Sequence, residues 1–292
     1  MTMDDAMRGG LTLVGTPIGN LGDLSPRARD ALAAADVVLA EDTRVSGRLL
    51  AACGIRGARL ERCDENVIAA RAQGLVERML AGEGMAFVSD AGMPAVADPG
   101  ARLVDACLDA GVPVDVVPGP SAVTCALAQA GFACESFYFG GFLPRRDAAR
   151  DRLLESLAAL PAALVFYESP HRSADSLDAI ARVLPARRVA LARELTKMHQ
   201  EVLRAPAAEL AAVVRAREGL RGEVAIVVDA PSREELEAAR GRLRDGAAFD
   251  LDDAIRRGLE AGTPKSALAR DLAARCGMTR GKVYERILEL AR

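Results

Sequence analysis

Residues 11–40 decide the fold of this chain, and they read LTLVGTPIGNLGDLSPRARDALAAADVVLA. An apolar run, Leu11–Gly15, ends in a glycine-rich turn and is followed by a helical pattern over Pro26–Ala35. Ser25 is suited to cap this helix, and a proline in the first turn favours its start. A second apolar run, Val37–Ala40, comes directly after the helix. A buried strand, a helix and another buried strand in succession are typical of a parallel α/β sheet.

The same alternation of apolar runs and helical patterns continues to about residue 230. Further strands are expected at Met85–Ser89, Val112–Val117, Ala163–Glu168, Arg188–Glu194, Gln200–Arg204 and Glu223–Asp229. Helices are expected at Ala69–Ala81, Gly100–Ala110, Ser121–Ala130, Ala148–Ala159, His171–Leu184 and Ala208–Arg217. Because Gln200–Arg204 lacks a crossover helix, the second sheet should be mixed. The pattern therefore predicts two α/β domains, over residues 11–120 and 121–230.

The C-terminal part, residues 231–292, is predicted to be a helical region. Pro231–Gly246 is charged and helix-prone, as a linker helix would be, and it is followed by three helical patterns, Leu251–Ala261, Lys265–Cys276 and Arg280–Leu290. The tight turn Gly277–Thr279 before the last helix, with basic residues behind it, resembles a helix-turn-helix. This region either contacts nucleic acid or is a small bundle that packs on the body of the protein.

The composition limits the class of protein. The chain has 292 residues, half of them apolar, which is enough for two domains. No apolar run approaches the ~18 residues of a membrane span, and Met1–Gly10 lacks the apolar core of a signal peptide, so a cytoplasmic protein without membrane contact is expected. Six scattered cysteines without a Cys-x-x-Cys pair, and only two histidines, predict no metal site.

The charge is unevenly distributed. The net charge is −3, but residues 232–292 carry 13 Lys+Arg against 11 Asp+Glu, so the remainder has a net charge of −5. A nucleic acid would therefore have to be bound by local basic patches rather than by the overall field.

Polar and glycine-rich motifs follow six of the predicted strands. In chain order they are VGTPIGNLGDLSPRA (14–28), AEDTR (40–44), SDAGMPAVADPG (89–100), PGPSA (118–122), FYESPHRSADSL (166–177) and ARELTKMHQE (192–201). Ligands of open α/β sheets bind at the carboxyl ends of the strands. Six such motifs together predict one binding site along these edges.

The glycine-rich motif at residues 14–28 can be compared with the motifs that bind dinucleotides and nucleoside triphosphates. A dinucleotide-binding G-x-G-x-x-G fingerprint starting at Gly15 would need glycine at positions 17 and 20, where Pro17 and Asn20 stand, and no Walker loop is present. Glu41 lies just past the second strand, where a ribose-binding acid would be placed. A nicotinamide-dependent enzyme therefore stays open as an interpretation.

Taken in order, TPIGNLGD, EDTR, DAGMPAVADPG, PGPSA, FYESPHR and RELTK resemble the tetrapyrrole methylase superfamily. Within it they are most similar to the branch that 2'-O-methylates a cytidine ribose in small-subunit ribosomal RNA. The resemblance runs from about Leu11 to Ala230, and FYESPHR with RELTK is its specific part. It implies two α/β domains with S-adenosyl-L-methionine in the cleft between them. It also implies a homodimer that acts on small-subunit ribosomal RNA or on the assembled small ribosomal subunit.

The resemblance carries site residues over by motif position. The cofactor should contact Pro17, Asp90, Ala91, Gly92, Met93, Ser121, Ala122, Tyr167 and Ala192. The candidates for the base that deprotonates a ribose hydroxyl are Glu168, His171, Glu194 and Lys197. Arg44, Arg172 and Arg193 are suited to clamp the phosphates of the RNA. Two departures are Arg221-Gly222-Glu223, where Lys-Gly-Glu is usual, and Gln200, where an acid is common.

Three further questions stay open. The segment ESFYFGGFLPRR (135–146) holds four of the ten aromatic residues and could stack a splayed base, line the core or form a dimer interface. A methylase acting on a tetrapyrrole would have the same cofactor loops and would be favoured by a deep apolar cleft without arginines. A non-catalytic RNA-binding protein would be favoured by RNA binding without S-adenosylmethionine binding.

Overall fold

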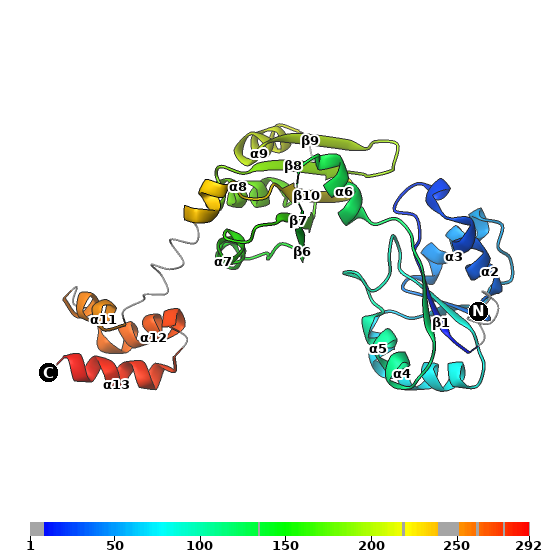
Figure 1. Ribbon diagram of the computed structural model, residues 1–292, viewed down its shortest axis with the longest axis horizontal. Coiled ribbons are helices and arrows are strands. Elements are labelled where there is room, and N and C mark those ends of the chain that lie inside the picture. The colour runs from blue at the N-terminus through cyan, green and yellow to red at the C-terminus, as the bar shows by residue number, and fades with distance from the viewer. Residues whose placement is uncertain are drawn as a thin grey trace. The chain divides into compact units, whose positions relative to one another are not determined.

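The computed structural model describes residues 9–133, 135–217, 220–238, 251–260, 263–276 and 278–291 (Figure 1). They form two compact units. The first holds both sheets and runs to residue 230 without 158–160, and the second holds 158–160 and the residues from 231 onward. The expectations for the N-terminal segment 1–8 and for most of the linker helix, 239–246, lie outside the described residues. Within those described, no helix is long and apolar enough to cross a membrane.

The first sheet is parallel throughout, as the sequence predicts. Its strands are β1 (Leu11–Val14), β2 (Val37–Ala40), β3 (Leu60–Arg62), β4 (Met85–Val88) and β5 (Val114–Val117), in the order β3-β2-β4-β1-β5. Each neighbouring pair runs parallel. Every residue of β1, β2 and β4 is buried, as expected of a sheet covered on both faces.

Helices cover both faces of this sheet. They are α2 (Pro26–Ala34), α3 (Thr43–Ala52), α4 (Glu65–Leu80) and α5 (Ala101–Asp109), with the short 3-10 helix η1 (Leu21–Asp23) before them. One face packs against α4 and α5 and the other against α2 and α3. The predicted cap of α2 is confirmed, because the Ser25 hydroxyl accepts a hydrogen bond from the Ala28 N–H at 3.1 Å.

The second sheet is mixed, which is also as predicted. Its strands are β6 (Phe137–Phe142), β7 (Ala163–Glu168), β8 (Arg188–Arg193), β9 (Glu201–Pro206) and β10 (Val224–Val228), in the order β6-β7-β10-β8-β9. β6 is parallel to β7, whereas β10 is antiparallel to β7 and β8, and β9 is antiparallel to β8. Its helices are α6 (Ala122–Ala130), α7 (Asp147–Leu157), α8 (Ser173–Val183) and α9 (Ala207–Arg215).

Four elements of the first unit were not predicted from the sequence: η1, α3, β3 and β6. The motif AEDTR follows β2 as expected, and the Asp42 side chain accepts a hydrogen bond from the Arg44 N–H at 2.8 Å, which caps the start of α3. β3 has only three residues, none of them buried. α4 begins at Glu65 rather than Ala69, because the Asp64 side chain caps it through the Val67 N–H at 3.0 Å.

The second unit contains the helices α11 (Leu251–Glu260), α12 (Lys265–Cys276) and α13 (Arg280–Leu290). They enclose a small core of their own, built from Ile255, Leu268, Ala269, Leu272, Val283 and Ile287. The three predicted helices are therefore confirmed in the described residues. Thr279 is the N-cap residue of α13, although its side chain makes no capping hydrogen bond.

Candidate active site

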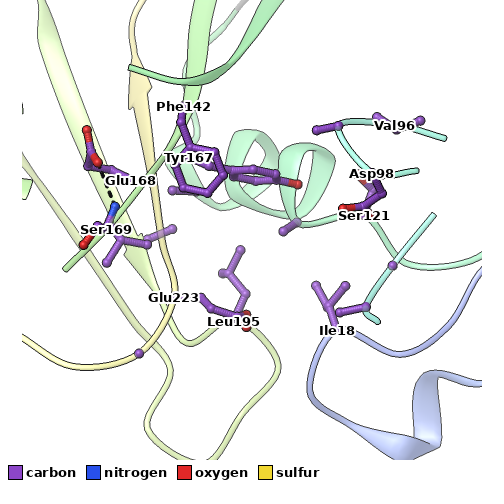
Figure 2. A pocket seen from close by; sticks show the side chains of 18 of the residues that line it. Ile18, Val96, Asp98, Ser121, Phe142, Tyr167, Glu168, Ser169, Leu195 and Glu223 are labelled. Carbon is purple, nitrogen blue, oxygen red and sulfur yellow. Dashed lines mark hydrogen bonds between the residues drawn. The ribbon is translucent and has the colours of Figure 1, made fainter. Parts of the chain in front are cut away.

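A cavity of about 380 Å³ in the first unit is lined by loops and strands of both sheets (Figure 2). Cavities that hold small ligands commonly measure roughly 300–1,000 Å³. The first-sheet lining is Ile18, Ala91, Gly92, Met93, Val96, Ala97 and Asp98. The remaining lining residues are Ser121, Ala122, Phe142, Tyr167, Glu168, Ser169, Pro170, Ala192, Leu195, Gly222, Glu223, Val224 and Ala225.

The glycine-rich motifs of the first sheet are fastened to one another beside this cavity. Thr16 and Gly92 exchange backbone hydrogen bonds of 2.9 and 3.1 Å, which joins the first motif to the third. The Met93 sulfur accepts a hydrogen bond from the Gly119 N–H at 3.2 Å, which joins the third motif to the fourth. Three segments far apart in the sequence therefore form one wall.

The loop 89–100 stores backbone strain where it faces the cavity. Ala95 and Ala97 have φ angles of 64° and 63°, in the left-handed region that residues other than glycine rarely occupy. The Ala95 N–H donates to the Pro99 carbonyl at 3.2 Å, so the strained turn is closed on itself. Such strain persists only where surrounding structure holds it, and it gathers at functional sites.

Seven of the nine residues predicted to contact the cofactor line the cavity: Ala91, Gly92, Met93, Ser121, Ala122, Tyr167 and Ala192. Pro17 and Asp90 do not line it, although their neighbours Ile18 and Ala91 do. The Asp90 carboxylate instead accepts a hydrogen bond from the Asp42 N–H at 3.1 Å, and it thereby connects the second and third motifs.

Two ionisable groups in the cavity have perturbed pKa values. Burial raises the pKa of Asp98; the Ser89 hydroxyl offsets part of this rise, and the nearby Asp90 carboxylate adds to it. Burial also raises the pKa of Tyr167 to about 12, with smaller contributions from Asp98 and Glu223. Figure 2 shows the Tyr167 hydroxyl directed toward Asp98 and Ser121. The cavity thus offers a hydroxyl that stays protonated and a carboxyl group that holds its proton more readily than usual.

Glu168 lines the cavity, but its carboxylate is engaged by three partners. It accepts hydrogen bonds from the Ser176 hydroxyl at 2.6 Å and from the Ser169 N–H at 2.8 Å. Arg172 lies 3.3 Å away and also donates to the Leu143 carbonyl at 2.6 Å. Glu168 and Arg172 therefore form a brace, defined here as this ion pair with its hydrogen bonds, between the cavity and the end of β6.

Lys197 belongs to an ion-pair cluster at the edge of the cavity. Its amine donates to Glu194 at 2.8 Å and to Glu223 at 3.2 Å. Burial by itself lowers the pKa of Lys197, but these two carboxylates outweigh it and raise the pKa above its ordinary value. The hydrogen bond from Lys197 in turn lowers the pKa of Glu194. In the described structure, Glu223 is the member of this cluster that lines the cavity.

The position before Glu223 requires a glycine, which is Gly222. Its φ angle is +91°, and a Cβ atom there would lie 2.4 Å from the Glu194 carboxyl carbon. The Glu223 N–H donates to the same carboxylate at 3.0 Å. The departure from the family pattern, Arg221 in place of lysine, leaves this arrangement intact.

The other predicted site residues lie outside the cavity lining. His171 is exposed. Arg193 donates to Glu201 at 3.4 Å and to the Arg221 carbonyl at 3.3 Å. Arg44 has an 87% exposed side chain and pairs with Asp42 at 2.6 Å. Each of the three predicted RNA-binding arginines, Arg172 included, therefore already has a carboxylate partner.

Several lining residues were not predicted. Asp98 lies inside the third motif and Phe142 inside the aromatic segment, so both carried a signal that was not assigned to the site. Val224 and Ala225 could not be recognised as site residues from the sequence, because they belong to an apolar strand that is buried along its whole length. Within the described residues, no group of three or more His, Cys, Asp or Glu could hold a metal ion.

Comparison with known proteins identifies what this arrangement resembles. The family model of the tetrapyrrole (corrin/porphyrin) methylases matches residues 10–211. A Mycobacterium tuberculosis protein named ribosomal RNA small subunit methyltransferase I is 41% identical over 287 residues, which cover 97% of this chain and 96% of the relative. A protein of the same name from Escherichia coli O157:H7 is 38% identical over 98% of this chain and 96% of its own length.

Solved structures are similar at a lower level of identity. The cobalt precorrin-4 methyltransferase of cobalamin biosynthesis has a TM-score of 0.57 and 20% identity, over 78% of this chain and 97% of that one. A uroporphyrin-III C-methyltransferase from Thermus thermophilus, complexed with S-adenosylhomocysteine, has a TM-score of 0.52 and 20% identity, over 75% and 96%. These likenesses concern the fold.

Proposed function

The chain belongs to the tetrapyrrole methylase family, and from this premise we propose that it is an S-adenosyl-L-methionine-dependent methyltransferase acting on small-subunit ribosomal RNA. The observation that carries the proposal is the near full-length identity to proteins named for that activity. The finer reaction, 2'-O-methylation of a cytidine ribose, is supported by FYESPHR and RELTK, the motifs that are specific to that branch of the family.

The cavity fits the cofactor in size and in chemistry. It combines apolar side chains such as Ile18, Met93 and Leu195 with the polar groups of Ser121 and Tyr167. A mixed lining of this kind suits a ligand with a nucleoside at one end and an amino acid at the other. S-adenosyl-L-methionine supplies a methyl group activated by its sulfonium. The residues that would hold it are the seven predicted contacts that line the cavity, with Pro17 and Asp90 supporting the same loops.

The protein must align the ribose hydroxyl with the methyl donor and remove the hydroxyl proton. Glu168 is fully engaged, Lys197 is held protonated and Glu194 is bound to Lys197, so positioning roles suit all three. His171 is exposed away from the cavity lining. Asp98 lines the cavity and has a raised pKa, which makes it a stronger base than an ordinary aspartate. We therefore assign the base to Asp98.

Replacing Asp98 tests this assignment. Asp98→Asn should lower kcat by roughly 10²–10⁴-fold, the usual contribution of a positioned base, while cofactor affinity changes little. The wild-type rate should rise with pH through the raised pKa of Asp98, and this rise should be absent from the variant. A kcat equal to that of wild type would return the role to Glu168 or Lys197.

The partners follow from the same proposal. We expect a homodimer, and we expect small-subunit ribosomal RNA or the assembled small subunit as substrate, both in the cytoplasm. Light scattering of the purified chain measures its molar mass in solution and therefore tests for the dimer. A monomer at micromolar concentration would remove the dimer from the proposal and leave the reaction untouched.

A tetrapyrrole substrate is the second candidate, and one observation favours it. In the described structure, no arginine or lysine lines the cavity. The sequence comparisons favour RNA, because the relatives of 38–41% identity carry the ribosomal name, whereas the tetrapyrrole methyltransferases of known structure are 20–23% identical.

A methyl-transfer assay with labelled S-adenosyl-L-methionine decides between them. The substrates are small ribosomal subunits and bare RNA extracted from them, both from cells that lack the protein, and a uroporphyrinogen-type tetrapyrrole. We expect label on a cytidine ribose of the subunit or the RNA. Label on the tetrapyrrole alone would replace the proposal. Binding of RNA without binding of the cofactor would indicate a non-catalytic protein.

A further inference from the structure

β6 contains an irregularity that re-directs one aromatic side chain. Phe139 pairs with Val165 of β7, so a regular strand would place Phe142 opposite Glu168. Phe142 pairs instead with Tyr167, because the register shifts between Phe139 and Phe142. Since side chains alternate between the faces of a strand, the shift of one residue brings Phe142 to the face that carries Phe139 and Tyr167.

Two glycines make this shift feasible. A Cβ atom on Gly140 would lie 2.5 Å from the Phe166 ring, and Gly141 has a φ angle of +62°. Bulges of this type are common next to active sites, where they re-aim a side chain. Here the re-aimed side chain is Phe142, which lines the cavity and stands edge-on to Tyr167, with ring centroids 5.8 Å apart (Figure 2).

Phe142 is directed at the cavity without being buried there. It remains 62% exposed, although it belongs to the cavity lining. The Tyr167 ring contacts the Phe142 ring edge-on, and the Phe139 ring packs edge-on against the same tyrosine, with ring centroids 4.9 Å apart. An aromatic ring that is held by other rings and keeps a solvent-facing surface is suited to stack a planar ligand.

Two basic residues follow Phe142 after Leu143 and Pro144. Arg145 and Arg146 are both exposed. Neither side chain has an ion pair or a hydrogen bond to another part of the described chain, in contrast to Arg44, Arg172 and Arg193. The Arg146 carbonyl accepts hydrogen bonds from the Ala149 and Arg150 N–H groups, which fixes the backbone at the start of α7. Two positive charges are therefore available on an ordered backbone.

The brace described above holds this segment in place. Arg172 donates to the carbonyls of Leu143 and Pro144 at 2.6 and 3.3 Å, and Glu168 holds Arg172. The backbone between Phe142 and Arg145 is thus tied to a buried carboxylate that itself lines the cavity. The segment 142–146 is pre-organised for binding rather than ordered by it, which lowers the cost of association.

We propose that residues 142–146 are the RNA-binding segment of this enzyme: Phe142 stacks on an unpaired nucleobase, and Arg145 and Arg146 bind the neighbouring phosphates. The proposal rests on the proposed function and specifies how its substrate is recognised. A base inside a duplex has no free face, so the segment binds a single-stranded or locally opened stretch of RNA. A bare tetrapyrrole offers a planar ring but lacks a phosphodiester backbone for the two arginines.

The stacking contact is tested by steady-state methyl transfer on whichever substrate, subunit or bare RNA, the wild-type protein methylates. Phe142→Ala should raise the KM for RNA by roughly 5- to 100-fold, the loss expected for one base–aromatic stack. Phe142→Trp should retain the wild-type KM. Phe137→Ala is the matched control, because Phe137 is 46% exposed on the same strand and does not line the cavity. The Kd for S-adenosyl-L-methionine, measured by calorimetry, should be unchanged in all three.

The phosphate contacts are tested by salt dependence. Arg145→Ala/Arg146→Ala should weaken binding of a fluorescein-labelled single-stranded RNA and reduce the slope of log K against log salt by roughly 1.4, since each phosphate contact in a single strand contributes about 0.7. Arg29→Ala/Arg56→Ala removes the same charge from two exposed sites elsewhere in the first unit. This control should leave both the affinity and the slope at their wild-type values.

The outcomes separate the two proposals. If the wild-type protein methylates no RNA, the proposed function fails. If it methylates RNA and the Phe142 and Arg145/Arg146 variants keep its KM and salt slope, the RNA-binding segment is refuted and the function stands. If Phe142→Ala weakens the cofactor rather than RNA, Phe142 belongs to the cofactor site and the stacking proposal is overturned.

Discussion

Glu168 shows how a residue with the expected chemistry can have a structural task. Its side chain is fully buried and bound by Ser169, Ser176 and Arg172. Glu168→Gln keeps the shape but removes the charge that Arg172 pairs with. The free energy of unfolding should fall by about 1–3 kcal/mol, because a buried polar network loses a charged hydrogen-bond acceptor. Urea unfolding measures this loss.

The same substitution should also act on the RNA site. Because the brace positions Leu143 and Pro144, Glu168→Gln should raise the KM for RNA while its effect on kcat stays small. Glu155→Gln, at an exposed position of α7, is the control for the loss of a negative charge. A large fall in kcat with an unchanged KM would instead make Glu168 part of the reaction, as the sequence first suggested.

Lys197 leads to a prediction about pH. The raised pKa of Lys197 means that its ion pairs stabilise the fold below the ordinary lysine pKa, and that this is lost as pH rises through the raised value. The lowered pKa of Glu194 means that the ionised carboxylate stabilises the fold above the ordinary glutamate pKa. This stabilisation is lost as pH falls through the lowered value. The ion pairs therefore contribute from about pH 5 to about pH 10.

Lys197→Met should consequently be less stable than wild type by a constant amount between pH 6 and pH 8, and the difference should shrink below about pH 4. Thermal unfolding across this range measures it. Lys265→Met removes an exposed lysine at the start of α12 and should show no such pH dependence. A difference that grows on acidification would mean that Lys197 is not held by Glu194 and Glu223.

Helix α2 illustrates what local sequence determines. Its N-cap Ser25 and first-turn proline were recognisable from the sequence, and the structure has both. Ser25→Ala should lower the free energy of unfolding by about 1 kcal/mol, and Ser25→Asp should restore most of it, because an aspartate also accepts from the free N–H groups. The Kd for S-adenosyl-L-methionine should not change, since α2 contributes no residue to the cavity lining. Urea unfolding and calorimetry check the two parts.

Helices and strands could be predicted where a run of apolar residues or a capping residue marks them. They could not be predicted where a segment becomes a strand only by pairing with a distant one. β2 and β4 are runs of apolar residues and were predicted nearly to the residue. β3, with the sequence LER, becomes a strand because β2 offers it an edge. β6 was seen as aromatic but not as a strand, because Gly140 and Gly141 interrupt the pattern.

The site was predictable to a similar extent, for a related reason. Motifs at the ends of strands gave most of the cavity lining, since the fold gathers these ends. Val224 and Ala225 lie on β10, and Glu223 directly precedes it; they reach the cavity because β10 pairs between β7 and β8. The roles of Glu168 and Arg172 could not be derived from the sequence. They depend on the carbonyl groups of Leu143 and Pro144, which follow the end of β6.

The division of the chain into two units leads to the last prediction. Every residue that lines the cavity belongs to the first unit, and the helices α11, α12 and α13 have their own core. A chain that ends at Ala230 should therefore bind S-adenosyl-L-methionine with a Kd within about twofold of the full chain, which is a free-energy change below about 0.5 kcal/mol.

The same truncation determines what the C-terminal helices do. If they only pack as a bundle, the KM for RNA should also be retained, whereas a contact through Arg280 or Lys282 would raise it and reduce the salt slope. Lys282→Ala in the full chain separates these cases, because it removes an exposed charge without removing the helices. A truncated chain that folds, as judged by circular dichroism, yet fails to bind the cofactor would contradict the assignment of the whole cofactor site to the first unit.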